Sequence, residues 1–322
     1  MSKTLVTGAA GFLGSHMVAR LRAEGREVVG IDNLSTGKPD NLRSFPDGGG
    51  FVFIGCDVTN PQLLSMRELT DVTEIYHLAS PASPKFYQAH PFETIEVNTT
   101  GTKLMLELAR RNGAKLVYSS TSEAYGDPLV HPQDESYRGN VNTWGPRACY
   151  DEAKRLGEVY CYEYFRRYGV RVKVARIFNT YSAGLRNDDG RVISNFVTQA
   201  IEGADLTVYG DGSQTRSFCY VDDTIRGLRL LMEKSVADGE IVNIGNPVEH
   251  TILHVAHTVI RLSGTSGGIR YLPLPEDDPK VRRPVITKAE TLLGWRPEVT
   301  LEEGLGRTIR AYRERMGGGT RS

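Results

Sequence analysis

The chain has few cysteines, and their positions exclude several classes of small stabilised protein. Its 322 residues include only four, Cys56, Cys149, Cys161 and Cys219, and no two of them have Cys-x-x-Cys or zinc-finger spacing. A disulfide framework or a structural zinc site needs paired, regularly spaced cysteines. We therefore expect reduced thiols and no metal site.

The chain also lacks net charge and long apolar runs. Lys and Arg total 39 and Asp and Glu total 39, so no global field attracts nucleic acid or an anionic membrane. No apolar run approaches the length of a membrane span, and the first predicted strand begins at residue 3, which leaves no room for a signal peptide. These features predict a cytoplasmic protein with no nucleic-acid or membrane partner.

A glycine-rich turn near the amino terminus predicts a dinucleotide site. Lys3–Thr7 has the composition of a strand, Gly8-Ala-Ala-Gly11-Phe-Leu-Gly14 opens an amphipathic helix that ends near Glu24, and a second strand, Glu27–Ile31, ends on Asp32. In this βαβ context, glycines allow a tight turn and a close approach of the pyrophosphate to the helix amino terminus. A lone glycine triplet without that context would be weak evidence.

Asp32 indicates which dinucleotide is bound. Its carboxylate can accept hydrogen bonds from both adenosine ribose hydroxyls, and it would repel a 2′-phosphate, so NAD is favoured over NADP. The alternative is a simple turn residue in Asp32-Asn-Leu-Ser. The predicted cofactor contacts are Gly8, Gly11, Phe12, Leu13, Gly14, Asp32, Asn33, Ser35, Thr36, Gly37, Asp57, Val58, Leu78, Ala79, Ser80, Tyr150 and Lys154.

Strand and helix patterns alternate along more than half of the chain, which predicts an α/β fold with a doubly wound, Rossmann-type parallel sheet. The further predicted strands are 51–54, 74–77, 115–118, 171–175 and 241–244, and the further helices are 61–67, 92–112 and 150–168. We expect residues 1–178 to form the NAD-binding domain, with 214–245 returning to it. Residues 179–322 should mainly form a smaller lobe that binds a nucleotide sugar.

Tyr150 and Lys154 suggest the chemistry. A free tyrosine has a pKa of about 10, but a lysine one helical turn away can stabilise the phenolate and make it a working base. Such a pair also arises by chance on many amphipathic helices. Together with an NAD site, it predicts oxidation of an alcohol.

Longer stretches resemble a known family. The chain resembles the extended short-chain dehydrogenase/reductases over nearly its whole length, and among them the UDP-glucuronic acid decarboxylases (UDP-xylose synthases). One departure is Ser182–Leu185, where such enzymes usually carry Gly-Pro-Arg. The stretches that carry the resemblance are His77–Pro84, Ser119–Pro128, Gly145–Lys154, Ala175–Thr180, Asp189–Val192, Gln214–Arg216, Asn243–Pro247 and Asp277–Arg282.

The resemblance implies a role for several residues. Tyr150 would be the base, Lys154 its activator, and Thr121 the hydroxyl that polarises the sugar oxygen. Ser122 and Glu123 stand where related dehydratases carry Asp-Glu, and Glu123 is expected near the substrate carboxylate and C5. The implied substrate contacts are Tyr87, Asn179, Arg191 and Arg216, with Arg282, or its neighbour Arg283, paired to the carboxylate.

Three functions remain open on the sequence. The first is decarboxylation of UDP-glucuronate to UDP-xylose through a 4-keto intermediate, by a homodimer that packs helices 92–112 and 150–168 against their symmetry mates. The second is a related outcome: release of the 4-keto pentose, or 4-epimerase or 4,6-dehydratase activity on another nucleotide sugar. The third is a non-catalytic NAD-binding sensor, which would need neither Tyr150 nor Glu123.

Overall fold

The computed structural model describes residues 3–46, 48–185, 190–273 and 281–317. Its centre is a seven-stranded sheet in the order β11-β6-β5-β4-β1-β2-β3, in which every pairing is parallel. This is the predicted doubly wound arrangement. The strands are β1 (Lys3–Thr7), β2 (Glu27–Asp32), β3 (Phe51–Gly55), β4 (Val72–His77), β5 (Lys115–Thr121), β6 (Val172–Ile177) and β11 (Ile241–Ile244).

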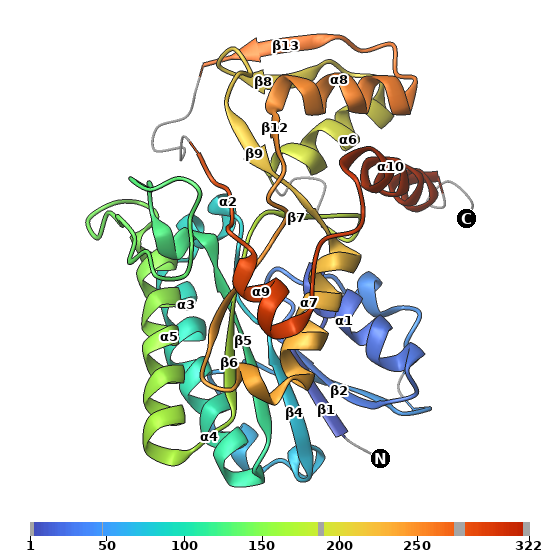
Figure 1. The fold of residues 1–322 in the computed structure, drawn as a ribbon. Coiled ribbons are helices and arrows are strands. Elements are labelled where there is room, and N and C mark those ends of the chain that lie inside the picture. Colours follow the sequence, from blue (N-terminus) through green and yellow to red (C-terminus); the bar gives the residue numbers. More distant parts are fainter. Residues whose placement is uncertain (1–2, 47, 186–189, 274–280, 318–322) are drawn as a thin grey trace.

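Helices cover both faces of the sheet (Figure 1). One face carries α1 (Phe12–Ala23) and α7 (Val221–Glu233); the other carries α3 (Pro91–Glu96), α4 (Thr102–Asn112) and α5 (Ala148–Tyr168). A π-helical turn, Val97–Gly101, joins α3 to α4. The strands read as nearly continuous apolar runs because both of their faces are buried in this way.

The predicted helix over 61–67 is wrong. Two 3₁₀ turns, Pro61–Ser65 and Arg67–Leu69, replace it, separated by the extended residue Met66. Asn60 caps the first turn by accepting from the backbone N–H of Gln62. The extended backbone of Met66, with ψ 130°, interrupts the helical conformation after Ser65, so no α-helix runs through 61–67.

A smaller lobe lies beyond the carboxyl ends of the strands, at the top of Figure 1. Outside this lobe, the chain also forms the short helix α2 (Pro84–Ala89) and the 3₁₀ turns 39–42, 122–125 and 235–237. The elements of the lobe and of its attachment to the sheet are β7 (Thr180–Tyr181), α6 (Val192–Glu202), β8 (Leu206–Tyr209), β9 (Thr215–Ser217), β10 (Cys219–Tyr220), β12 (Glu249–Thr251), α8 (Ile252–Ser263), β13 (Ile269–Leu272), α9 (Thr287–Leu293) and α10 (Leu301–Gly317).

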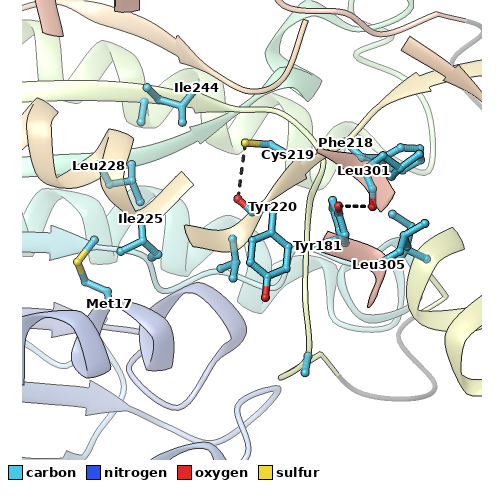
Figure 2. Packing of buried hydrophobic residues seen from close by; sticks show 14 of the residues in the cluster. Met17, Tyr181, Phe218, Cys219, Tyr220, Ile225, Leu228, Ile244, Leu301 and Leu305 are labelled. Carbon is cyan, nitrogen blue, oxygen red and sulfur yellow. Dashed lines mark hydrogen bonds between the residues drawn. The ribbon is translucent and has the colours of Figure 1, made fainter. Parts of the chain in front are cut away.

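The apolar core runs without a break from the sheet into this lobe. Met17 of α1 and Leu228 of α7 belong to the same buried cluster as Tyr181, Leu301 and Leu305 (Figure 2). The Tyr181 hydroxyl donates to the carbonyl oxygen of Leu301 at 3.3 Å. A shared core fixes the lobe against the sheet, because separating the two would expose this apolar surface to water.

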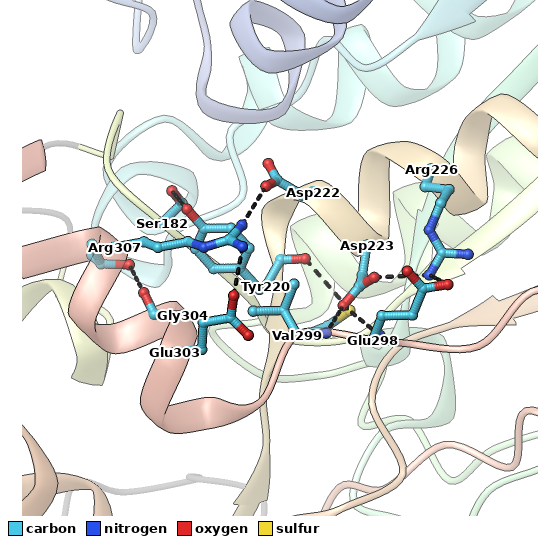
Figure 3. A network of polar contacts seen from close by, with 12 residues as sticks. Ser182, Tyr220, Asp222, Asp223, Arg226, Glu298, Val299, Glu303, Gly304 and Arg307 are labelled. Atoms are coloured by element: carbon cyan, nitrogen blue, oxygen red, sulfur yellow. Dashed lines mark hydrogen bonds and ion pairs between the residues drawn. The ribbon is translucent and has the colours of Figure 1, made fainter.

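Polar contacts fasten the chain that leads into α10. The buried carboxylate of Asp223, on α7, accepts from the backbone N–H groups of Glu298 and Val299 at 2.9 and 2.8 Å. Arg307 of α10 donates to Asp222 and to Glu303 (Figure 3). The backbone between α9 and α10 is therefore tied directly to a helix that packs on the sheet.

Candidate active site

A cavity of about 980 Å³ opens at the carboxyl ends of β1, β2, β4, β5 and β6, where parallel sheets usually bind their ligands. Of the predicted site residues, Gly37 and the alternative Arg283 do not line it. The others do: Gly8, Gly11, Phe12, Leu13, Gly14, Asp32, Asn33, Ser35, Thr36, Asp57, Val58, Leu78, Ala79, Ser80, Tyr87, Thr121, Ser122, Glu123, Tyr150, Lys154, Asn179, Arg191, Arg216 and Arg282.

The glycine turn leaves no room for side chains. Gly8 has φ +68°, and a Cβ at Gly8 would lie 2.9 Å from the Cα of Ala79. A Cβ at Gly14 would lie 1.9 Å from the carbonyl oxygen of Gly8. Helix α1 begins after Gly11 with no side-chain cap, so its first N–H groups point into the cavity mouth as an anion site would require.

Two backbone N–H groups hold the carboxylate of Asp32 at the end of β2. Its two carboxylate oxygens accept from the backbone N–H groups of Ala10 at 3.0 Å and Leu34 at 2.8 Å. Burial raises the pKa of Asp32, and these hydrogen bonds oppose the rise. Gly37 lies behind the carboxylate, where a Cβ would come within 2.9 Å of an Asp32 oxygen. Gly37 therefore preserves the position of Asp32.

Neighbouring loops complete a site that fits NAD. The Thr7 hydroxyl accepts from the backbone N–H groups of Leu78 and Ala79, at 3.1 and 3.2 Å, which holds this loop against the glycine turn. Asn33 donates to Asp57 at 2.6 Å. A crowded glycine turn, an uncapped helix start and a ribose-binding carboxylate are the features that a dinucleotide needs.

Tyr150 and Lys154 lie on one face of α5, both buried. The Lys154 Nζ donates to the carbonyl oxygen of Ser119 at 2.7 Å and lies 5.8 Å from the centre of the Tyr150 ring. The Tyr150 ring stacks on Tyr87, with centroids 4.9 Å apart and planes 7° apart. Tyr150 and Lys154 are thus held in place by one strand, β5, and by the two helices α2 and α5.

The electrostatics of this pair differ from the sequence-based expectation. Burial raises the pKa of Tyr150, and a hydrogen bond with Thr121 opposes the rise. Burial also lowers the pKa of Lys154 to about 7. The pKa of Tyr150 is therefore raised overall, and Lys154 is not among the groups that oppose the rise, because burial destabilises the lysine charge itself.

Glu123 is clamped between two arginines. One oxygen accepts from Arg282 Nη1 at 2.6 Å, and the other accepts from Arg147 Nη2. Burial by itself would raise the pKa of Glu123, but the two arginines outweigh it and lower the pKa. Arg282 also donates to the Ser122 hydroxyl at 3.1 Å. The Ser122-Glu123 pair therefore presents a firmly ionised carboxylate beside Tyr150.

Two residues of this cluster were missed in the sequence. Arg147 and Asp151 flank Tyr150 in Gly145–Lys154, three residues before it and one after. Burial and the nearby Glu123 raise the pKa of Asp151 to about 7, and its Oδ1 has no hydrogen-bond partner among the described residues. Helical spacing was the available signal, since Arg147 lies three residues before Tyr150 and four before Asp151, and residues three and four apart share a helix face.

The predicted nucleotide contacts lie at the lobe end of the cavity. Asn179 precedes β7, Arg191 stands at the start of α6, and Arg216 lies in β9. The Ser182–Leu185 departure packs toward the cofactor side: Ala183 and Gly184 accept from His16 and Asn41 at 3.0 and 3.2 Å. The loop thus borders the glycine turn, and it also contributes Gly184 and Leu185 to the cavity wall.

Some predictions concern parts of the chain that the structure leaves undescribed. Asp189, of the 189–192 stretch, and residues 277–280, of the stretch that ends at Arg282, lie outside the described residues. Within the described part, no cluster of His, Cys, Asp and Glu side chains could hold a metal ion. No described helix has both the length and the apolar character required to cross a membrane.

Several curated proteins similar to this chain are UDP-glucuronic acid decarboxylases. UDP-glucuronic acid decarboxylase 1 of Danio rerio is 50% identical over 310 residues, which cover 96% of this chain and 72% of the relative. UDP-glucuronic acid decarboxylase 5 of Arabidopsis thaliana is 49% identical over 316 residues, which cover 98% of this chain and 90% of the relative. The similarity therefore includes both the sheet and the lobe.

Solved structures agree on the fold. A UDP-glucose 4-epimerase from Thermotoga maritima is 31% identical with a TM-score of 0.90, covering 98% of this chain and 99% of its own. A UDP-glucuronic acid 4-epimerase from Bacillus cereus is 30% identical with a TM-score of 0.85, and the match covers 97% of this chain and 99% of the epimerase chain. The family model described as "NAD dependent epimerase/dehydratase family" matches residues 4–245. This chain therefore belongs to the NAD dependent epimerase/dehydratase family.

Proposed function

We propose that this protein decarboxylates UDP-glucuronate to UDP-xylose with bound NAD as a catalytic cofactor. The observation that carries the proposal is the Glu123 carboxylate clamped by Arg147 and Arg282 beside Tyr150. A sugar with a carboxylate at C6 needs such a charged cluster next to the base. The identity of about 50% with curated decarboxylases, against about 30% with solved epimerases, supports the same choice.

The residues divide the chemistry between them. Tyr150 removes the proton of the sugar C4 hydroxyl, and Thr121, hydrogen-bonded to it, holds the same oxygen in place. NAD, when bound, supplies a positively charged ring and the reversible transfer of the C4 hydride. Lys154 anchors the helix end to Ser119 and faces the tyrosine ring.

Loss of carbon dioxide follows from the position of the carboxylate. In the 4-keto sugar, C6 is β to the ketone, so the electrons of the C5–C6 bond move into an enolate as carbon dioxide leaves. The hydroxyls of Tyr150 and Thr121 can stabilise that oxygen. We assign to Glu123 the positioning of the water that returns a proton to C5. Reduction at C4 then completes UDP-xylose.

The test is incubation with UDP-glucuronate and NAD, with carbon dioxide and the absorbance of reduced nicotinamide followed together. We expect carbon dioxide to be released over many turnovers without net reduction of NAD. Equal amounts of carbon dioxide and reduced cofactor would indicate release of the 4-keto pentose. Interconversion of UDP-glucuronate with its C4 epimer, without carbon dioxide, would indicate an epimerase. Binding of NAD with no reaction would indicate a sensor.

We also propose a homodimer that forms through α3 and α5. These helices lie along one outer side of the molecule in Figure 1, and both carry exposed apolar side chains. Among them Phe92 is 78% exposed and Val159 is 53% exposed. A monomer rarely leaves such a stripe in water. The others are Ile95, Leu156, Tyr162, Phe165 and Tyr168.

Light scattering of matched variants tests the dimer. Tyr162→Glu should give a monomer at micromolar concentration, because it places a charge within the proposed interface. Tyr271→Glu is the control, since Tyr271 is equally exposed, at 55% against 57%, but lies on β13 in the lobe. A wild-type monomer, or a dimer in both variants, would contradict this interface. Cytoplasmic location stays a prediction from composition.

A further inference from the structure

The two terminal nitrogens of Arg282 are engaged with protein groups, and its Nε is buried without a hydrogen-bond partner among the described residues. Its Nη1 donates to Glu123 and Ser122, and its Nη2 donates to the carbonyl oxygen of Gly126 at 2.8 Å. The side chain is 3% exposed. A substrate carboxylate could pair with the two terminal nitrogens of Arg282 only by displacing these partners, so those nitrogens are better suited to holding Glu123 than to receiving the substrate.

Most N–H donors of Arg147 make no hydrogen bond within the described residues. Within the described residues, its guanidinium makes one hydrogen bond, to Glu123. Its side chain is 22% exposed and lines the cavity. A planar guanidinium carries five N–H donors, and two of them match a carboxylate in parallel. Arg147 can therefore keep Glu123 on one nitrogen while the others face a second anion.

Tyr87 supplies a second donor at the same place. Its ring is 1% exposed and stacks on the Tyr150 ring. Its hydroxyl is buried without a hydrogen-bond partner among the described residues, and the charges nearest to it are those of Arg147 and Glu123. A buried hydroxyl without a partner is costly in a folded protein, unless a ligand completes it.

We propose that Arg147 and Tyr87 bind the C6 carboxylate of the substrate, and that Arg282 acts as a positioning residue for Glu123. The inference rests on the proposed function and deepens it. Arg147 and Arg282 carry two positive charges and Glu123 one negative charge, so the cluster has a surplus of one positive charge while Asp151 is protonated. A carboxylate neutralises that surplus, whereas the neutral hydroxymethyl group of a UDP-hexose does not. The cluster therefore selects uronic acids.

The test compares binding of UDP-glucuronate and UDP-glucose to the NAD-loaded protein. Arg147→Met should weaken UDP-glucuronate binding by about 10-fold or more, the size expected for a lost charge-assisted pair, with little change for UDP-glucose. Arg147→Lys should recover part of the loss, because the charge remains. Tyr87→Phe keeps the ring stack and should give a smaller loss in the same direction. Arg20→Met, at an exposed pair on α1, is the control.

Arg282→Met should behave differently. It frees Glu123, so turnover should fall by more than the affinity for UDP-glucuronate does. If Arg147→Met leaves the ratio of the two affinities unchanged, or lowers both affinities equally, the carboxylate assignment is wrong and Arg147 is only structural. Wild-type protein that binds UDP-glucuronate tightly but releases no carbon dioxide would instead contradict the proposed function and leave this inference standing. Melting temperatures and UDP binding show whether each variant is folded.

Discussion

Replacing Asp151 by Asn should change how stability depends on pH. This carboxyl is 5% exposed, and burial together with Glu123 raises its pKa from the ordinary 3.8 to about 7. Folding therefore takes up a proton between these two pKa values. For an acid whose pKa is raised on folding, stability falls as the pH rises through that window and is level above it. Asn carries no titrating group and removes this dependence.

The magnitude follows from the width of the window. One pKa unit corresponds to about 1.4 kcal/mol. Between about pH 5 and pH 7 the wild type should thus lose on the order of 3 kcal/mol of stability through Asp151 alone. Ionised Asp151 would also cancel the surplus positive charge that Arg147 and Arg282 leave beside Glu123. UDP-glucuronate binding should weaken above about pH 7 for the same reason.

Urea unfolding at about pH 5 and pH 8 measures the effect, at one protein concentration. The difference in unfolding free energy between wild type and Asp151→Asn should shift by about 2 to 3 kcal/mol in favour of the variant at the higher pH. Glu163→Gln, on a partly exposed residue of the same helix α5, is the control and should show no such shift. An equal difference at both pH values would refute the argument that the buried carboxyl titrates near neutrality.

Three further changes test the cofactor and base sites. Tyr150→Phe should fold and bind NAD but lose about 10²- to 10⁴-fold in turnover, because only the proton acceptor is removed; unchanged turnover would exclude Tyr150 as the base. Asp32→Ala should relax the preference for NAD over NADP in binding titrations, and equal use of both by the wild type would contradict the role of Asp32. Gly14→Ala should abolish NAD binding, because its Cβ would lie 1.9 Å from the Gly8 carbonyl oxygen, so tight NAD binding would contradict the crowded turn.

Local patterns predicted much of the fold. Lys3–Thr7, the glycine turn and Glu27–Asp32 form a βαβ unit whose signals lie within about 30 residues, so periodicity and turn chemistry were sufficient. The shared helix face of Tyr150 and Lys154 was likewise predictable, because it follows from their local spacing of four residues. The helix predicted over 61–67 failed because a short apolar segment after a proline does not distinguish an α-helix from 3₁₀ turns.

The charge cluster could not be predicted from local signals. Arg282 is 160 residues from Ser122 and 159 from Glu123 in the sequence, and only the return of the chain from the lobe brings them together. The sequence suggested that Arg282 is a partner for the substrate, whereas its donors face the protein. Arg147 and Asp151 gain their roles from that same contact, because Glu123 links them to Arg282. Their residue types alone predict only an exposed helix start.

The product formed in heavy water tests the central claim most directly. If the protein decarboxylates UDP-glucuronate through a 4-keto intermediate, a solvent proton must replace the lost carboxylate at C5. Proton NMR of a reaction run in deuterium oxide should therefore show UDP-xylose with one deuterium at C5 and hydrogen retained at C4. Recovery of a UDP-hexuronate epimerised at C4, with its carboxylate intact and no deuterium at C5, would contradict the account.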